Sequence, residues 1–411
     1  MKLKKCAIVI PGFLPVPATK GGAVEVLIEE LINGNEIEKK FDFDLYNIST
    51  SDIKSTNYKH CNIIYLKYNM IDILKGYLYK MILRLQKKDG HCNVGSYIYG
   101  LKVKKCLKNK QYDCYLIENN MKIYELLNIK KNVIFHLHND VFEDDKPKYL
   151  CLDIIDNCNN IITVSDYLTN KMKSLKNSAK IKTLYNCVDL NIYSDMNMDK
   201  HIKDEIRNQY HMDKNDFIYI YTGRIIEEKG VLELCMAFKE IAKNHKCKLL
   251  IVGAANFDKN DKNEFEMKLS KCVEEVKDDI IFTGFIDHNM IPKLLYTADC
   301  VVIPSKWEEP FGVVALEAMA MKKPIVSTIS GGLTEMLNDS NSIIIDKNND
   351  FIENLVVGMK KMLNDEDFRN RLALNAYNYL ISNPSFDKNN YFKNFMNIIE
   401  DSGDKDEIKN I

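Results

Sequence analysis

The sequence predicts an α/β protein made of two doubly wound, Rossmann-like domains that face each other across a cleft. Short β-branched runs alternate with helical segments before residue 189, and the alternation begins again after residue 215. Such alternation is typical of parallel sheets with crossover helices. The 411 residues, 46% of them hydrophobic, suffice for two separate cores. Ligands of such folds bind at the carboxyl ends of the strands, so we expect the site in the cleft.

The first domain is expected over residues 1–190. Helical spacing of apolar residues covers segments such as 23–32 and 77–85. The pattern loosens between Asp189 and Asn215, where a polar stretch surrounds a short helix, and we place the domain boundary there. Strands are predicted at residues 7–10, 45–48, 62–66, 114–117, 133–137 and 161–164.

The second domain is expected over residues 191–385. After Pro384 the chain resumes as a helix over 390–399, within a terminal segment 386–411. Strands of this domain are predicted at residues 217–221, 249–252, 280–282, 300–303, 325–327 and 342–345.

The composition argues against several classes of protein. The net charge is −1, so nothing global indicates a nucleic-acid partner. Twelve cysteines without a Cys-x-x-Cys pair favour reduced thiols in a cytoplasmic protein over a zinc or redox motif. The apolar run that ends at Pro11 is too short for a signal peptide, and no run approaches the about 18 apolar residues of a membrane span.

One segment combines a strand, a loop and the start of a helix. The apolar run 300–303 precedes a loop that contains Glu309 and ends at Gly312, and residues 313–321 have helical spacing. Unpaired amides and the helix dipole make such a helix start an anion site, and a glycine lets a phosphate approach the main chain. Glu309 and Glu317 would lie at most about 10 Å apart. They could therefore flank a diphosphate and accept hydroxyls on either side; the alternative is an acidic surface helix.

Two cations follow the first strand of the second domain. Arg224 and Lys229 lie five residues apart in a strand-to-helix loop, where they could clamp a diphosphate as a guanidinium fork and a point charge. The alternative is a solvated loop in which Glu227 and Glu228 neutralise both cations.

The first domain carries two weaker signals. Gly21 and Gly22 lie between its first strand and first helix, where they permit left-handed backbone angles and an anion at the helix start. His136 and His138 end a strand and point to the same side, so a metal site must be considered, although the sequence identifies no third ligand. A histidine satisfied within the sheet edge is the alternative for His138.

These motifs together resemble the retaining glycosyltransferases of family 4, which have the GT-B fold. The resemblance rests on Glu309-x7-Glu317, on Gly223-Arg224-x4-Lys229-Gly230, on Gly21-Gly22-Ala-Val-Glu, and on the histidine that ends the strand. It implies transfer of a sugar from a nucleotide diphosphate donor, expected to be a UDP-sugar, with neither a metal nor another cofactor. It implies catalytic roles for His138, Arg224, Lys229 and Glu309, and substrate-binding roles for Gly21, Gly22, Phe311, Gly312, Val313, Val314 and Glu317. In GT-B proteins the terminal helix, here within 386–411, crosses back to the first domain.

Two further motifs are interpreted as structural. Asp42-Phe43-Asp44 mimics the Asp-x-Asp metal motif of another glycosyltransferase fold, but it introduces a strand and lies beside no nucleotide-binding segment. Residues 331–335 (Gly-Gly-Leu-Thr-Glu) fit the family pattern, and we interpret them as turn geometry and packing behind the site.

Residues 75–110 are the one strongly asymmetric charge segment, with ten basic residues and one acid interleaved with tyrosines and aliphatic residues. Solvated helix faces explain most such runs. The alternative is a surface that contacts anionic lipid or an anionic acceptor at the inner face of the membrane.

The leading hypothesis is a glycosyltransferase that acts on a hydroxyl of a glycan, a lipid-linked glycan or a cell-surface polymer precursor. A GT-B epimerase or phosphorylase acting on the same donor is a rival, as is a non-catalytic coat or assembly protein that keeps the fold. An epimerase would need no acceptor, and a coat protein would tolerate loss of Glu309.

Overall fold

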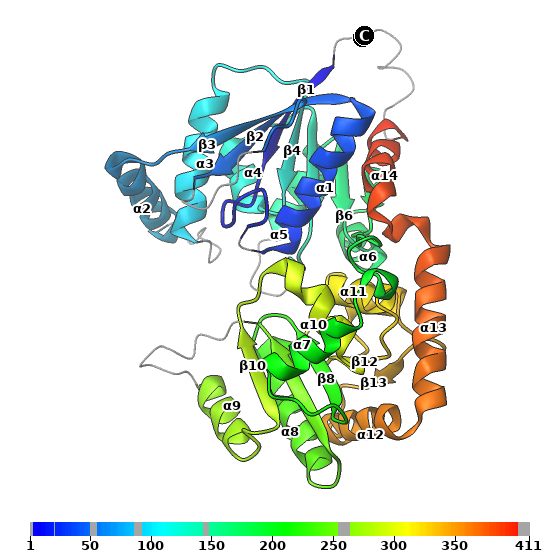
Figure 1. The fold of residues 1–411 in the computed structure, drawn as a ribbon. Coiled ribbons are helices and arrows are strands. Elements are labelled where there is room, and N and C mark those ends of the chain that lie inside the picture. Colours follow the sequence, from blue (N-terminus) through cyan, green and yellow to red (C-terminus); the bar gives the residue numbers. More distant parts are fainter. Residues whose placement is uncertain are drawn as a thin grey trace. The chain divides into compact units, whose positions relative to one another are not determined.

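The computed structural model describes residues 3–19, 21–49, 56–85, 93–142, 148–253 and 264–401. The chain divides into two compact units, Met1–Asn186 with Lys388–Ile411 (unit 1) and Cys187–Asp387 (unit 2) (Figure 1). Each unit contains one parallel sheet, which confirms the predicted α/β class with two Rossmann-like parts. Among the described residues, no helix combines the length and the apolar composition that crossing a bilayer requires.

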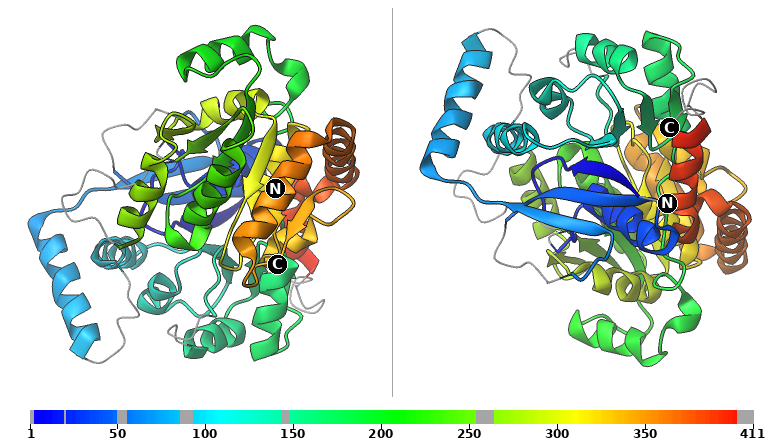
Figure 2. Two further views of the ribbon diagram at one scale, coloured as in Figure 1. Left: turned by 90° about the horizontal axis from the view of Figure 1, so that it is seen from below. Right: turned by 90° about the horizontal axis from the view of Figure 1, so that it is seen from above.

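Unit 1 is built on a seven-stranded sheet with the order β3-β2-β1-β4-β5-β6-β7. Helices lie on both faces of this sheet (Figure 2). The strands are β1 (Lys4–Val9), β2 (Phe41–Ile48), β3 (Cys61–Leu66), β4 (Cys114–Glu118), β5 (Val133–Leu137), β6 (Asn160–Thr163) and β7 (Ile181–Thr183). The helices are α1 (Ala23–Glu38), α2 (Met70–Leu85), α3 (Val94–Leu107), α4 (Met121–Leu127), α5 (Lys148–Asn157), α6 (Asp166–Leu175) and α14 (Lys388–Asp401).

Unit 2 has a six-stranded sheet with the order β10-β9-β8-β11-β12-β13. Its strands are β8 (Phe217–Thr222), β9 (Cys247–Val252), β10 (Ile280–Gly284), β11 (Cys300–Ile303), β12 (Ile325–Thr328) and β13 (Ile343–Ile345). Its α-helices are α7 (His201–Gln209), α8 (Val231–Ala242), α9 (Glu264–Glu274), α10 (Ile291–Thr297), α11 (Val313–Ala320), α12 (Phe351–Asn364) and α13 (Glu366–Ser382). Apolar residues from β8, β9, β11 and α8 form one buried core, since these strands are covered on both faces.

The strand orders locate the crevices in which ligands of such sheets bind. In unit 2 the chain runs from β8 outward to β10 and then returns to β11 on the other side of β8. The direction of winding therefore reverses between β8 and β11, and ligands bind where the loops after two such strands diverge. In unit 1 the same reversal falls between β1 and β4.

The structure corrects three details of the sequence prediction. Strand β7 was not predicted, and α2 begins at Met70, seven residues before the predicted helix. Asp42 and Asp44 lie inside β2 rather than before a strand. The carboxylate of Asp44 accepts hydrogen bonds from Tyr112 and Lys110, so it joins β2 to the segment that precedes β4.

Candidate active site

The loops that follow β8 and β11 pack directly on each other. Gly230 ends η2 (Glu227–Lys229) in the left-handed region, at φ 68°, and a Cβ there would lie 1.9 Å from the carbonyl oxygen of Pro304. The amides of Lys306 and Trp307 donate to the Glu228 carbonyl oxygen at 2.9 and 3.2 Å. The two loops therefore form one platform at the carboxyl end of the sheet, where the winding reverses.

Lys229 and Glu309 pair across this platform. The Lys229 Nζ lies 2.6 Å from Oε1 and 2.9 Å from Oε2 of Glu309, and it lies 4.9 Å from the centre of the Trp307 ring. Both side chains are largely shielded, with exposed fractions of 18% and 7%. The hydroxyl of Ser305 donates a further hydrogen bond to Glu309. The ammonium has three donors, so one stays available for a third acceptor.

The contact between Lys229 and Glu309 contradicts the alternative in which Glu227 and Glu228 neutralise the cations of this loop. Lys229 pairs with Glu309 instead, 80 positions along the chain, because β8 and β11 are neighbours. Arg224 is exposed, and no hydrogen bond or ion pair reaches its side chain from the described residues. The two predicted phosphate-binding cations therefore differ, since one is held by a carboxylate and the other is free to meet a ligand.

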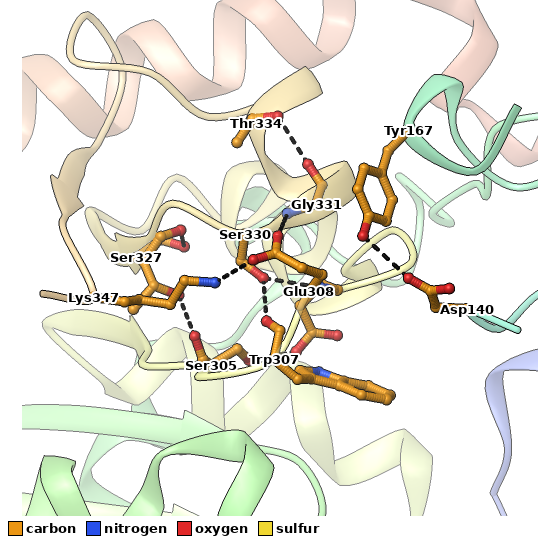
Figure 3. A network of polar contacts seen from close by, with 12 residues as sticks. Asp140, Tyr167, Ser305, Trp307, Glu308, Ser327, Ser330, Gly331, Thr334 and Lys347 are labelled. Atoms are coloured by element: carbon orange, nitrogen blue, oxygen red, sulfur yellow. Dashed lines mark hydrogen bonds and ion pairs between the residues drawn. The ribbon is translucent and has the colours of Figure 1, made fainter. Parts of the chain in front are cut away.

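The main chain around Glu309 is fixed by residues that follow β12. The Ser330 hydroxyl accepts from the Glu309 amide at 2.9 Å and donates to the Trp307 carbonyl at 2.7 Å (Figure 3). Figure 3 also shows Glu308 between Lys347 and the amide of Gly331. A Cβ at Gly331 would lie 2.3 Å from the Glu309 carbonyl oxygen. Residues 331–335 therefore form a tight turn packed on the loop that contains Glu309, in agreement with the predicted turn geometry.

Helix α11 begins at the edge of the same platform. Gly312 is its N-cap with φ 102°, and a Cβ there would meet Leu333 at 2.2 Å. Phe311 is buried before the cap, and Val313 and Val314 form the first turn. The first amides of a helix have no intrahelical partner, and the helix dipole is positive at this end. An anion can bind here without an additional side chain.

Glu317 lies inside α11 and contacts a residue that the sequence interpretation missed. The Tyr193 hydroxyl donates to Oε1 of Glu317 at 2.8 Å, and both side chains are buried. Burial raises the pKa of Glu317 to about 7, against the lowering effect of the Tyr193 hydrogen bond. Glu317 is therefore poised between its neutral and ionised forms near neutral pH. Tyr193 is 124 positions from Glu317, so no local pattern reveals the pair.

The predicted site residues of unit 1 lie at the carboxyl ends of its strands. Gly21 and Gly22 have φ values of 74° and 108°, as expected for a loop that only glycine adopts easily, and Gly22 caps α1. A Cβ at Gly22 would lie 2.2 Å from Oε2 of Glu25. Burial raises the pKa of the Glu25 carboxyl to about 7, with a further contribution from the charge of Glu118.

His138 follows β5 and is held by Glu118, which ends β4. Its Nε2 lies 2.7 Å from Oε2 of Glu118, and the centre of the His136 ring lies 3.9 Å from that of the His138 ring, with the planes tilted by 46°. Burial and the charge of His136 lower the pKa of His138 to about 4. Burial favours the neutral form of Glu118, but His136 and His138 outweigh it and lower its pKa to about 2. The ionised carboxylate can only accept, so Nε2 of neutral His138 carries the proton and Nδ1 is an acceptor.

Glu118, His136 and His138, here called the Glu118 cluster, are the described residues that could hold a metal ion. One ligand atom from each lies within 4.8 Å of the others, and all three side chains are buried. Nδ1 of His136 lies 3.2 Å from Oε2 of Glu118, and Oε1 of Glu118 and Nε2 of His136 have no hydrogen-bond partner among the described residues. Two imidazoles and a carboxylate suit a divalent transition metal. Glu118 would be the third ligand of such a site, and the sequence did not identify it because it comes from the adjacent strand.

Comparison with known proteins finds glycosyltransferases. Residues 202–379 match the family model "Glycosyl transferases group 1". The chain is 29% identical over 229 residues to lipopolysaccharide 1,2-N-acetylglucosaminetransferase of Salmonella typhimurium, which covers 54% of this chain and 56% of that one. It is 26% identical over 346 residues to spore coat protein SA of Bacillus subtilis, covering 82% and 83% of the two chains. The crystal structure of Anabaena HepE in complex with UDP and glucose superposes with a TM-score of 0.70 at 17% identity, covering 97% and 100%.

The fold is therefore GT-B, and the protein is a glycosyltransferase. The segment that matches the group 1 family model spans most of unit 2.

Proposed function

We propose that the protein is a retaining glycosyltransferase of family 4 that transfers a sugar from a UDP-sugar to a hydroxyl group. The acceptor is a glycan, a lipid-linked glycan or a cell-surface polymer precursor, and the reaction takes place in the cytoplasm or at the inner face of the membrane. It needs neither a metal nor another cofactor. The Anabaena neighbour is described as a complex with UDP and glucose, which supports the donor class. The Salmonella relative acts on lipopolysaccharide by its name, which supports the acceptor class.

The observation that carries this proposal is the pairing of Lys229 with Glu309 on the platform next to the start of α11. A leaving diphosphate gains negative charge as the glycosidic bond breaks. The free donor of Lys229, the Arg224 guanidinium and the amides of Gly312 and Val313 would stabilise that charge. Donors held in place before the reaction usually supply the largest catalytic effect. No divalent cation is then needed to neutralise the diphosphate.

The two carboxylates serve the rings on either side of the diphosphate. Glu309 is fixed by Lys229 and Ser305, so it can orient a sugar hydroxyl without reorganising. Glu317 is buried within α11 and would accept hydrogen bonds from ribose hydroxyls once it is ionised. The two carboxyl groups differ in their neighbours, because Glu309 contacts the Lys229 ammonium and Glu317 contacts the Tyr193 phenol.

His138 would contact the transferred sugar or the acceptor. Glu118 positions the ring through Nε2, which leaves Nδ1 to accept a hydrogen bond from a hydroxyl. Retention follows a same-face route, in which the departing phosphate accepts the proton of the acceptor hydroxyl as the new bond forms.

Trp307 allows a direct test of the donor, because it is the single tryptophan and lies 4.9 Å from the Lys229 ammonium. Fluorescence titration with UDP, GDP and ADP, and then with their sugars, should show the tightest binding for the uridine compounds. Lys229→Gln should weaken that binding, and the exposed Lys243→Gln on the surface of unit 2 is the matched control. Tighter binding of GDP or ADP would contradict the donor assignment.

Incubation of the preferred UDP-sugar with candidate acceptors, followed by NMR of the anomeric proton, tests the reaction itself. We expect the product to keep the anomeric configuration of the donor. Interconversion of the UDP-sugar without any acceptor would instead establish the epimerase rival. An inverted product would contradict the retaining mechanism but not the donor site.

A further inference from the structure

Helix α2 exposes a continuous row of large apolar side chains. Eight of its residues are between 40% and 79% exposed, and they are Met70, Ile71, Leu74, Tyr77, Leu78, Met81, Ile82 and Leu85. Single exposed apolar residues are normal on a protein surface, but a contiguous set of this size marks an interaction site.

The exposed apolar residues share one face of the helix. At 3.6 residues per turn they fall within an arc of about 140°. The opposite face packs on α3, where a Cβ at Gly76 would lie 2.2 Å from Ile98, and where the rings of Tyr79 and Tyr97 meet edge to face at 5.5 Å. Figure 1 shows α2 beside α3 at the outside of unit 1. The apolar face is therefore not the one that this unit buries.

Basic side chains border the apolar face. Lys75 and Arg84 fall just beyond the two edges of the arc, by the same helical geometry. Helices α2 and α3 together carry six lysines or arginines and a single acid, Asp72, whose carboxylate is bound to Lys102 at 2.6 Å. Residues 86–92 of the predicted basic segment lie outside the described residues.

A groove between α2 and α3 has both basic and apolar side chains in its lining. Its volume is about 390 Å³. Three lysines and Asp72, which pairs with Lys102, line it together with aliphatic side chains, and the lining includes Lys75, Lys102, Lys105, Leu78, Ile82 and Ile98. A phosphate group with the start of an acyl chain would find a cation and an apolar wall in this groove.

We propose that α2 docks the protein on a bilayer surface that contains anionic phospholipid. The apolar face enters the boundary between headgroups and acyl chains, and the bordering cations contact lipid phosphates. A second copy of the chain fits less well, because a symmetric contact places the same patch on both partners and would bring like charges together. An anionic surface neutralises these charges. Docking does not depend on the proposed sugar transfer.

Vesicle co-sedimentation of the full chain tests this proposal. Binding to vesicles of phosphatidylcholine with phosphatidylglycerol should exceed binding to phosphatidylcholine alone. Lys75→Gln and Arg84→Gln should each weaken binding about fivefold, and less at high salt. Leu74→Ser with Met81→Ser should abolish it. The control is Leu374→Ser, which removes a side chain of unit 2 that is 53% exposed.

Three outcomes would overturn the proposal. The first is binding that does not depend on the phosphatidylglycerol content, and the second is binding that survives Leu74→Ser with Met81→Ser. The third is a dimer in light scattering that these same changes dissociate, which would assign the apolar face to a second copy. Nucleotide titration through Trp307 should be unchanged in every variant, which shows that unit 2 is intact and separates failure of docking from failure of the donor site.

Discussion

Binding of the nucleotide sugar should depend on pH through Glu317. Burial raises the pKa of this carboxyl to about 7. If ribose hydroxyls donate to Glu317, the donor binds the ionised form, which is about one-tenth of the protein at pH 6 and about nine-tenths at pH 8. The apparent dissociation constant should therefore fall about tenfold across this range. The stability of the free protein depends on pH with the opposite sign. A carboxyl whose pKa is raised in the folded state stabilises the fold below about pH 4.5, and this stabilisation is lost as the pH rises through about 7.

Trp307 fluorescence measures this dependence, with an intact UDP-sugar as the ligand because its diphosphate does not titrate in this range. Glu317→Gln should remove the slope. Tyr193→Phe should move the midpoint to higher pH, since the tyrosine hydroxyl lowers the pKa of Glu317. His288 lies 3.4 Å from the Tyr193 hydroxyl and burial lowers its pKa, so His288→Gln is the control for a second titrating group. A flat profile for the native protein, or a slope that persists in Glu317→Gln, would refute the reasoning.

Three further predictions concern the platform and the Glu118 cluster. Glu309→Gln should slow sugar transfer about a hundredfold or more. UDP should bind to this variant at least as tightly as to the native protein, because the Lys229 ammonium loses its counter-charge. An equal reduction of UDP binding and turnover would contradict this prediction. Gly230→Ala should destabilise unit 2 by more than about 1 kcal/mol in thermal unfolding, and the control Gly284→Ala, with φ 70° and open space, should cost less. A chelator should leave the rate of sugar transfer unchanged. If a chelator instead abolishes transfer and zinc restores it, the Glu118 cluster is a metal site.

Much of the fold could be predicted because buried parallel strands have a strong local signal. Strands β5 and β11 begin and end at the predicted residues, since each is a short apolar run bounded by polar residues. Strand β7 was missed, because it is three residues long and contains Lys182. The start of α2 was missed for another reason. The apolar residues in its first turns are exposed rather than packed on the core. An apolar pattern in the sequence does not show whether the helix face that it forms is packed or exposed.

The site was predictable only as far as its chemistry is local in sequence. The start of α11 and Gly312 follow from a strand, a loop and a helical pattern that are contiguous. The partner of Lys229 does not, because the ion pair depends on β8 and β11 being neighbours in the sheet. The same holds for Glu118, which reaches His138 from the adjacent strand. Sequence motifs identify the candidate catalytic and binding residues, and the order of the strands in the sheet determines which of these residues come into contact.

An anion site that contains two carboxylates looks unfavourable until their charges are considered. The Glu309 carboxylate is compensated by Lys229 at 2.6 Å, and the Glu317 carboxyl is protonated in about half of the molecules near neutral pH. An arriving diphosphate therefore meets less repulsion than the residue count suggests. It also meets Arg224, which no described residue pairs, and the positive end of α11. The platform can thus attract a diphosphate first and use its carboxylates for hydroxyl groups afterwards, because binding of the ribose itself favours ionisation of Glu317.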